Sequence, residues 1–457
     1  MKSTAANGGF VDRRCEGLGD MEVLEDQQLV EQIFIFLTAS ELSVLAQVSK
    51  ACYIYAHYDD LWRELTLDYF EGDWTYRESW KQTYIDAHVH RLKSLNQHVP
   101  EIVAHKSLVI DGFFSDMLYD EWQSSIVDLT FWSDQCPENI DRRSGMSVAE
   151  FDEQYGIPNK PVILTDQVPT WPAWKRWNKK DLIERFHGKT FQVGRVETTL
   201  DKYFIYCAES HDEKPIYLFD NLYGDKYPDM LDDYVVPSYF RTDYFALLNK
   251  KDRPSYRWIL MGPPRSGSTF HKDPNSTSAW NGLISGLKMW IMYPPDCPPP
   301  AVFPSKDEAE VTTPVSVTEW MLRFYKEVSR PSAVKPIQCL QRPGDLIYIP
   351  NGWWHQVLNI EECIAVTQNV VCDANLLNVV KFLKAKKRPD VWNAFQAAMA
   401  THHPGKLEAA EEEIAREKKA FHVEAPEPSE IFERGGAFWK PNNFSFSSMF
   451  SKPSQQH

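Results

Sequence analysis

The chain has 457 residues, of which 43% are hydrophobic and 13% aromatic, and its formal net charge is −15. This length predicts two or three domains, and thirty prolines with sixteen tryptophans favour a loop-rich β architecture over helical repeats. The acidic balance argues against broad binding to a nucleic-acid backbone. No apolar run approaches the roughly 20 residues of a membrane span. We also expect no signal peptide, no zinc ribbon and reduced cysteines.

The N-terminal part of the sequence predicts short helices. Residues 1–20 are expected to form a disordered tail. Apolar residues then recur at helical spacing between residues 24 and 37, and Ser40 is predicted to cap the next helix. A third helical pattern ends at residues 61–65. Together these helices predict a compact bundle over residues 21–85 with one exposed apolar edge, followed by a connector over residues 86–106.

This bundle resembles an F-box. The matching motifs are Glu-Leu-x-x-Leu-x-x-Val-Ser-Lys at residues 41–50 and Leu61-Trp62, whereas Glu25 stands where the family usually has proline. The resemblance implies docking to a Skp-type adaptor of a cullin ubiquitin ligase. The alternative is a helical subdomain that packs on the rest of the chain.

From Ser107 onward the pattern changes towards short strands. A helix is predicted at residues 148–155, a buried strand at 160–164 and a helix at 181–186, while residues 202–207 fit either type. Between Trp258 and Val371 short strands bounded by Pro or Gly predict an all-β sandwich or barrel. These strands are expected at residues 257–261, 287–293, 345–349, 355–358 and 364–367. A helix at 374–400 and an exposed, charged helix should follow, before a loose tail.

A candidate metal site lies within this β-rich region. His271-Lys272-Asp273 fits one β-strand, on which His271 and Asp273 would point to the same face. A further histidine, His355, follows 355 − 273 = 82 residues later, so a closed or sandwiched sheet must bring it back. Two imidazoles and one carboxylate are the ligands of a mononuclear non-haem iron(II) site that keeps coordination positions open.

A candidate anion site accompanies these ligands. Lys288 is a charged residue in an otherwise apolar strand, and either faces solvent or is buried with an anion. Asn281 precedes it, and Thr367 and Asn369 alternate on a later strand. If the electron donor is 2-oxoglutarate, its distal carboxylate needs a fixed cation and hydrogen-bond donors, which these residues could supply.

The surrounding motifs resemble one family closely. They are Gly-Pro-Pro-Arg-Ser-Gly-Ser at residues 262–268, His-x-Asp-Pro at 271–274, Thr-Ser-Ala-Trp-Asn at 277–281, Pro-Gly-Asp at 343–345, Pro-x-Gly-Trp-Trp-His at 350–355 and Thr-Gln-Asn at 367–369. The family is the jumonji-C (JmjC) 2-oxoglutarate oxygenases, in the branch of the arginine demethylase and lysyl hydroxylase once called the phosphatidylserine receptor. The resemblance implies a mainly β chain with a double-stranded β-helix, a jelly-roll barrel with flanking helices, over residues 107–380. C-terminal helices and a loose tail would occupy residues 381–457.

Carried over by position, the resemblance also implies roles for individual residues. His271, Asp273 and His355 would bind Fe(II). Lys288 would pair with the distal carboxylate of 2-oxoglutarate. The remaining residues of the cosubstrate pocket would be Thr367 and Tyr217 as hydroxyl donors, Asn281, and Ser268.

The function we predict is an Fe(II)- and 2-oxoglutarate-dependent protein oxygenase that uses O2. It would hydroxylate lysine or demethylate methyl-arginine or methyl-lysine, with histone tails as candidate substrates for an acidic protein. The alternative is an F-box substrate receptor whose barrel binds without catalysis, and a third reading is a metal-dependent small-molecule cupin. Residues 384–388 form a basic cluster that fits a solvated helix face better than a localisation signal. We expect a nuclear or cytoplasmic protein without nucleic-acid or membrane contacts.

Overall fold

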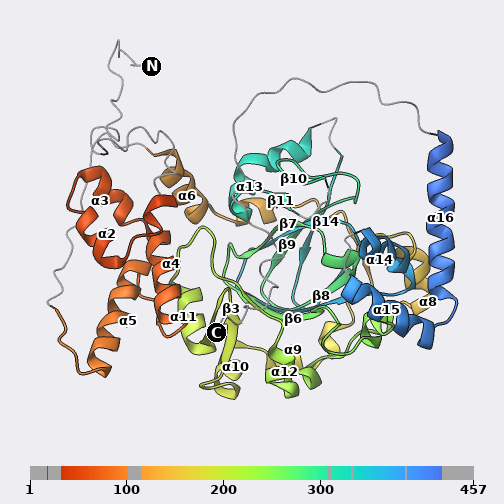
Figure 1. Ribbon diagram of the computed structural model, residues 1–457, viewed down its shortest axis with the longest axis horizontal. Helices are drawn as coiled ribbons and strands as arrows, with labels where there is room; N and C mark the ends of the chain where they lie inside the picture. The colour runs from red at the N-terminus through yellow and green to blue at the C-terminus, as the bar shows by residue number, and fades with distance from the viewer. Residues whose placement is uncertain are drawn as a thin grey trace, which may run out of the picture. The chain divides into compact units, whose positions relative to one another are not determined.

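The computed structural model describes residues 32–100, 115–306, 310–330, 334–385 and 389–424, together with Leu18 (Figure 1). The predicted tails, the F-box-like segment before residue 32 and residues 386–388 of the basic cluster lie outside these residues. The chain divides into two compact units, Met1–Val127 with Ile183–Pro215, and Asp128–Leu182 with Ile216–His457. None of the helices in the described part is both long enough and apolar enough to cross a membrane.

The first unit consists of helices and one hairpin. Thr38, rather than the predicted Ser40, caps the first complete helix, because its hydroxyl accepts from the Glu41 amide while the Glu41 carboxylate accepts from the Thr38 amide. The predicted connector is helical in its first half, since one helix crosses the limit at residue 85. The helices are α2 Ala39–Leu45, α3 Lys50–Ala56, α4 Asp59–Phe70, α5 Trp80–Ser94, α6 Asp116–Ile126 and α11 Leu200–Glu209, and the hairpin is β3 Thr190–Val193 with β4 Val196–Thr199.

Buried aromatic rings and a carboxylate join the two chain segments of this unit. Trp80 packs against Tyr206 with ring centroids 5.5 Å apart. The Trp80 indole N–H and the Tyr206 hydroxyl both donate to the Asp212 carboxylate, at 3.0 and 2.7 Å. Residues 183–215, which the sequence placed in the oxygenase domain, therefore pack with the N-terminal helices.

The second unit is built around two sheets. Figure 1 shows β7, β9 and β14 facing β6 and β8. One sheet has the order β1-β2-β13-β8-β15-β6-β5 within this unit, and the other has the order β12-β9-β14-β7. The first comprises β1 Asp141–Arg143, β2 Val162–Leu164, β5 Leu218–Asp220, β6 Arg257–Gly262, β8 Ser278–Ser285, β13 Leu346–Ile349 and β15 Cys363–Val370, and the second comprises β7 Gly267–His271, β9 Lys288–Tyr293, β12 Ile337–Gln341 and β14 Trp354–Asn359.

From β6 to β15 the strands of these two sheets alternate along the chain, except that β9 and β12 lie in the same sheet and are separated in sequence by the strands β10 and β11. This alternation is the topology of a cupin-like core, as predicted, and it brings β7 beside β14 although their sequences are far apart. The strands are buried on both faces, which explains their continuous apolar runs. A short hairpin, β10 Phe303–Pro304 with β11 Val311–Thr312, accompanies this core.

Helices surround the core in larger number than the mainly β prediction allowed. The predicted helix at 374–400 is two helices of this unit. In the first unit, residues 202–207, which fitted either type, are helical as well. The mainly β prediction rested on the numbers of proline and tryptophan residues. These numbers reflect loops and a large core, but they carry no information on how many amphipathic helices pack around that core. The α-helices of the second unit are α7 Thr130–Ser133, α8 Val148–Phe151, α9 Ala173–Arg176, α12 Tyr223–Lys226, α13 Val317–Phe324, α14 Asp373–Ala385, α15 Pro389–His402 and α16 Lys406–Glu424, while the division between the units falls within α10 Lys179–Arg185.

Candidate metal and cosubstrate site

Three side chains that are distant in the sequence converge between β7 and β14. His271 and His355 lie opposite each other in the ladder, and their ring centroids are 4.2 Å apart. Asp273 lies just beyond the end of β7, so the predicted single strand is two residues too long, but its backbone stays extended. One ligand atom from each of the three residues lies within 4.8 Å of the others. The predicted convergence is therefore confirmed.

Backbone carbonyls fix the orientation of both imidazoles. Nδ1 of His271 lies 2.7 Å from the Thr269 carbonyl oxygen, and Nδ1 of His355 lies 3.0 Å from that of Trp353. Since a carbonyl only accepts, each Nδ1 carries the proton. Each Nε2 then presents a lone pair, which is the tautomer that a metal ligand needs.

Burial sets the charge of the three groups. It lowers the pKa of His271, with help from His355, and that of His355, in each case to about 4. It raises the pKa of Asp273 to about 6, against the opposing effects of His271 and Asn369. At neutral pH the site therefore holds two neutral imidazoles and one carboxylate, the protonation state that binds a divalent metal.

The Asp273 carboxylate is only partly satisfied by protein. Asn369 donates a hydrogen bond to it and also donates to Thr277 Oγ1 at 2.7 Å. The second oxygen, Oδ2, is buried and has no hydrogen-bond partner within the described part of the chain. A buried carboxylate oxygen without a partner is costly, and a cation at the position the imidazoles face would satisfy it. The residues present therefore fit a ferrous ion.

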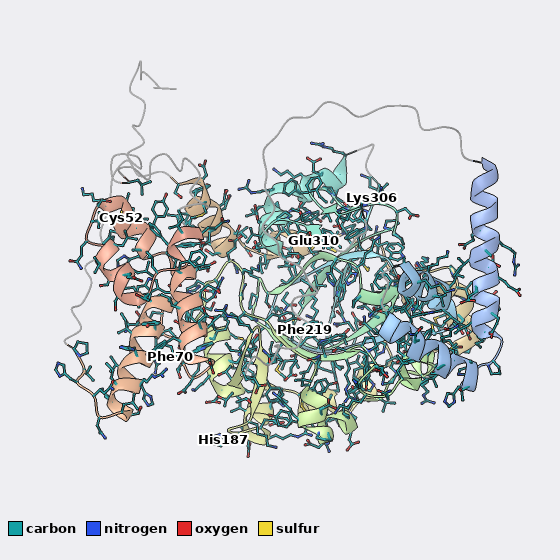
Figure 2. All side chains as sticks on the ribbon, viewed as in Figure 1. Cys52, Phe70, His187, Phe219, Lys306 and Glu310 are labelled. Carbon is teal, nitrogen blue, oxygen red and sulfur yellow. The ribbon has the colours of Figure 1, made fainter. Side chains whose placement is uncertain are left out.

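A cavity between the two sheets extends from this triad. Its lining combines polar groups with aromatic and aliphatic side chains. Phe219, labelled in Figure 2, is one of the aromatic lining residues. The lining residues are Tyr217, Phe219, Trp258, Leu260, Ser268, His271, Asp273, Pro274, Ala279, Asn281, Lys288, Trp290, Ile349, His355, Val357, Thr367 and Asn369. All eight predicted site residues are among them.

Lys288 is the cation of this cavity. It is 1% exposed, and its ammonium donates to the Tyr217 hydroxyl at 3.1 Å and to Asn359 Oδ1 at 2.7 Å. Burial alone would lower the pKa of Lys288, but Tyr217 and Cys363 outweigh it, so the pKa is raised. Within the described residues no carboxylate pairs with this ammonium. Because a buried cation is stable when paired, the cavity is suited to an anionic ligand.

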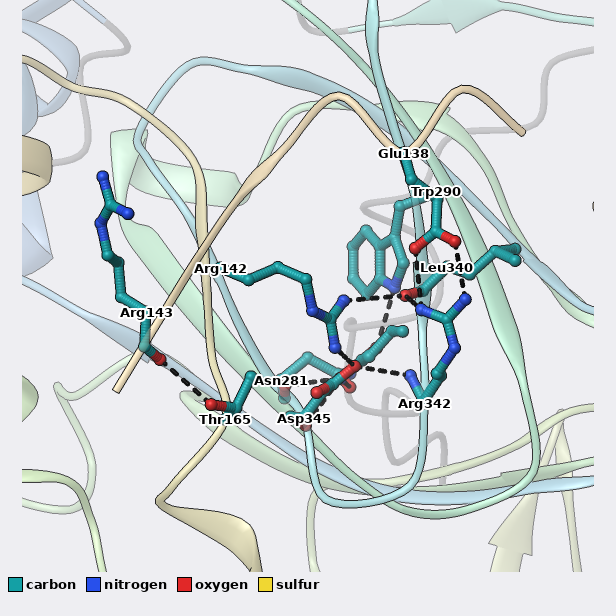
Figure 3. A network of polar contacts seen from close by, with 10 residues as sticks. Glu138, Arg142, Arg143, Thr165, Asn281, Trp290, Leu340, Arg342 and Asp345 are labelled. Atoms are coloured by element: carbon teal, nitrogen blue, oxygen red, sulfur yellow. Dashed lines mark hydrogen bonds and ion pairs between the residues drawn. The ribbon is translucent and has the colours of Figure 1, made fainter. Parts of the chain in front are cut away.

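Asn281 is oriented by residues behind it. The Trp290 indole N–H, which can only donate, lies 2.8 Å from Gln341 Oε1. Gln341 Nε2 therefore faces Asn281 and donates to its carbonyl oxygen at 2.8 Å and to Oδ1 at 3.2 Å. Because Gln341 donates to Asn281 Oδ1, the Asn281 NH2 group is the part of this side chain that can donate to a ligand in the cavity. Figure 3 shows Asn281 beside a network of ion pairs, in which Arg142 pairs with Asp345 at a distance of 2.5 Å.

The two hydroxyl groups of the cavity differ in what they can offer. Tyr217 accepts from Lys288, so its own proton can be donated to a ligand. Thr367 donates to the Trp280 carbonyl at 2.7 Å and presents lone pairs to the cavity. The predicted donor role of Thr367 would need this bond to break. Ser268, opposite Val357 in the ladder, lines the cavity as well.

Asn359 and Gln341, which contact Lys288 and Asn281, were not predicted from the sequence. Asn359 is four residues after His355 on the same strand and so shares its face, because side chains alternate. That spacing could have identified it. Gln341 carries no such signal, because its contact with Asn281 depends on how β12 lies against β8.

Comparison with known proteins agrees with this geometry. The family model described as JmjC domain, hydroxylase matches residues 258–370. The chain is 40% identical to the arginine-specific demethylase JMJ22 of Arabidopsis thaliana, over 91% of this chain and 82% of that protein. It is 35% identical to the lysine-specific demethylase JMJ21 of the same plant, over 80% of this chain and 38% of that protein.

A third relative comes from an animal. The chain is 34% identical to the bifunctional arginine demethylase and lysyl-hydroxylase psr-1 of Caenorhabditis elegans, over 59% of this chain and 70% of that protein. The identity to JMJ22 extends over most of both chains, and the triad lies inside the matched family region. The chain therefore belongs to the JmjC-domain hydroxylases and is an iron- and 2-oxoglutarate-dependent oxygenase.

Proposed function

We propose that this oxygenase acts on side chains of other proteins, hydroxylating lysine or demethylating methylated arginine or lysine. The observation that carries the proposal is the adjacency of two features in one cavity. These are the triad with the unpartnered Asp273 oxygen and the buried Lys288 ammonium without a carboxylate partner. The printed activities of JMJ22, JMJ21 and psr-1 support a protein side chain as substrate.

Each group of the cavity has a distinct task in this reaction. When bound, iron and 2-oxoglutarate supply the oxidation of a C–H bond with O2, with release of succinate and CO2. His271, His355 and Asp273 would hold the metal through two Nε2 atoms and a carboxylate oxygen. Lys288 would pair with the distal carboxylate of 2-oxoglutarate, and Tyr217 would donate its hydroxyl proton there. The apolar walls exclude water and fix the orientation of the bound molecules.

The same cavity serves either outcome on the substrate. A hydroxyl group placed on a lysine side-chain carbon is stable. A hydroxyl group placed on an N-methyl carbon collapses to formaldehyde and leaves the nitrogen demethylated. The net charge of −15 favours encounter with Lys- and Arg-rich segments such as histone tails.

The test is a turnover assay of the purified protein with Fe(II), 2-oxoglutarate and O2. We expect succinate to form, and His271→Ala and Asp273→Ala to abolish it, because each removes a metal ligand. Mass spectrometry of Lys- and Arg-rich peptides should find products heavier by about 16 or lighter by about 14 daltons, from adding one oxygen or losing one methylene. Succinate formation that persists in both variants would contradict the metal assignment. Turnover without peptide modification would contradict a protein substrate.

A second function is favoured by an exposed apolar surface in the first unit. Its residues are Ile33, Ile35, Phe36, Val44 and Val48, with exposed fractions from 45% to 85%. Soluble proteins rarely expose several large apolar side chains from adjacent segments without a partner. We propose this surface as the docking site for a Skp-type adaptor, which is the role that the F-box-like motif predicts.

The docking proposal is tested by binding to a purified Skp-type adaptor. We expect Val44→Asp to abolish binding, because it places a charge in the apolar contact. Leu95→Asp is the matched control, since Leu95 is an exposed apolar residue of the same unit outside this surface. Wild-type protein that fails to bind, or equal binding by both variants, would contradict the proposal.

A further inference from the structure

The Lys288 ammonium is held from behind by an amide that no motif identified. Asn359 lies directly opposite Lys288 in the antiparallel ladder of β14 and β9, and residues opposite each other project from the same face of a sheet. The Lys288 ammonium donates to Asn359 Oδ1 at 2.7 Å, which is shorter than its 3.1 Å bond to Tyr217. Asn359 is 0% exposed. The bond between the two side chains is therefore shielded from water.

The hydrogen bonds that continue from Asn359 run in one direction. An ammonium can only donate, so Asn359 turns Oδ1 towards Lys288 and Nδ2 away from it. Nδ2 then donates to Ser266 Oγ at 2.8 Å, and the Ser266 hydroxyl donates to the Pro263 carbonyl at 2.5 Å. This series of hydrogen bonds begins at the Lys288 ammonium, which can only donate, and ends at the Pro263 carbonyl, which can only accept. The orientation of the Asn359 amide is therefore determined.

The backbone fixes this chain of hydrogen bonds in place. The Arg265 amide donates to the Asn359 carbonyl, and the Asn359 amide donates to the Ser266 carbonyl, both at 2.9 Å. Gly262 opens the turn that carries Ser266, and a Cβ atom there would lie 2.3 Å from Ser266 Oγ and 2.5 Å from Tyr217 Cδ2. The turn at residues 262–267 thus packs against both partners of the Lys288 ammonium.

We propose that Asn359, held by Ser266, is a positioning residue that aims the Lys288 ammonium at the distal carboxylate of the cosubstrate. Two of the three N–H bonds of the ammonium point to Asn359 and Tyr217, which leaves the third for the cavity. A lysine side chain has four rotatable carbon–carbon bonds, and two fixed acceptors restrict them before the ligand arrives. The inference rests on the proposed pairing of Lys288 with that carboxylate.

The test compares two 2-oxo acids by calorimetry on the Fe(II)-loaded protein without oxygen. 2-Oxoglutarate and 2-oxobutyrate share the 2-oxo acid group that chelates the metal, but 2-oxobutyrate lacks the distal carboxylate. In Asn359→Ala we expect the Kd of 2-oxoglutarate to rise about tenfold, the size of one lost hydrogen bond to a charged group, while the Kd of 2-oxobutyrate stays unchanged. A purely structural role would weaken both ligands equally, and that result would overturn the proposal.

Two further variants locate the effect at the ammonium. Lys288→Ala should remove the preference for 2-oxoglutarate, and adding Asn359→Ala to it should cause no further loss, because the group to be aimed is gone. Additive losses in the double variant would contradict the positioning role. Retention of the preference in Lys288→Ala would instead refute the pairing itself, so the two failures are distinguishable.

Milder and matched substitutions complete the experiment. Ser266→Ala keeps the Asn359 side chain but removes its acceptor, so we expect a smaller rise in the Kd of 2-oxoglutarate alone. Asn375→Ala is the control, because Asn375 is equally buried and its amide donates to the Val370 carbonyl at 2.9 Å, away from Lys288. This control should keep the wild-type ratio of the two Kd values. A wild-type ratio in Ser266→Ala and Asn359→Ala as well would overturn the proposal.

Discussion

At the scale of single residues, the site depends on how burial sets protonation. Both histidines have a pKa lowered to about 4 and Asp273 a pKa raised to about 6, in each case mainly because burial disfavours the charged form. The same low-polarity surroundings destabilise Asp273 Oδ2, which has no hydrogen-bond partner among the described residues, and the Lys288 ammonium, whose two hydrogen-bond partners are uncharged. Both groups would therefore gain from a ligand of opposite charge.

We predict the pH dependence of metal affinity from these pKa values. As pH falls through about 6, Asp273 gains a proton that competes with the metal, whereas the imidazoles stay neutral until about pH 4. Between pH 6 and 5 the apparent Kd for Fe(II) or Co(II) should rise about fivefold, as expected for one competing proton on a group whose pKa is about 6. Anaerobic titrations at several pH values measure it. A Kd that stays constant down to pH 5 would contradict the prediction.

At the scale of elements, the pairing of β7 with β14 brings His271 beside His355. Gly267 makes this pairing possible, because its φ of +142° suits glycine and a Cβ atom there would lie 2.0 Å from the Val357 carbonyl oxygen. The register also shifts between His355 and Val357. A backbone irregularity of this kind redirects side chains beside a site.

We expect Gly267→Ala to lower both stability and metal affinity. The added methyl group would push β7 away from β14, at a cost of about 1–3 kcal/mol for overpacking, and would separate the two imidazoles. Urea denaturation and metal titration measure the two effects. Gly145→Ala is the control, since Gly145 also has a positive φ, +67°, but nothing within 4 Å of its added Cβ. Equal losses in both variants would show that strain, rather than the strand contact, is responsible.

At the scale of the whole molecule, each compact unit has its own core. In the first unit a segment distant in sequence, residues 183–215, packs with the N-terminal helices through Trp80, Tyr206 and Asp212. In the second unit the core between the sheets combines apolar side chains from both, such as Ala279 and Ile347 from one sheet and Met292 and Val357 from the other. The site lies wholly within the second unit.

The Asp212 contact predicts how the first unit responds to mutation. Asp212→Ala would remove the acceptor that the Trp80 indole N–H and the Tyr206 hydroxyl share, so we expect a loss of about 1–3 kcal/mol in the free energy of unfolding. Asp73→Ala is the matched control, because Asp73 pairs with Lys202 while 82% exposed and should cost at most about 1 kcal/mol. Chemical denaturation followed by tryptophan fluorescence measures both. An Asp212→Ala variant as stable as the control would contradict the role of this contact.

The sequence by itself determined the local features of this protein. Alternating and continuous apolar runs predicted the strands that carry Lys288 and His355, and the His-x-Asp spacing predicted two ligands on one face, because these patterns arise from backbone geometry within a few residues. The family motifs then predicted eight of the residues that line the cavity, whereas its other lining residues were not predicted.

Only the tertiary structure decided how distant segments meet. It placed residues 183–215 with the N-terminal helices, and it set Asn359 behind Lys288 and Gln341 behind Asn281. These contacts join side chains 71, 60 or more than a hundred residues apart, and no periodicity within an element encodes them. They depend on which strands pair and in which register, which is fixed by packing the whole core at once.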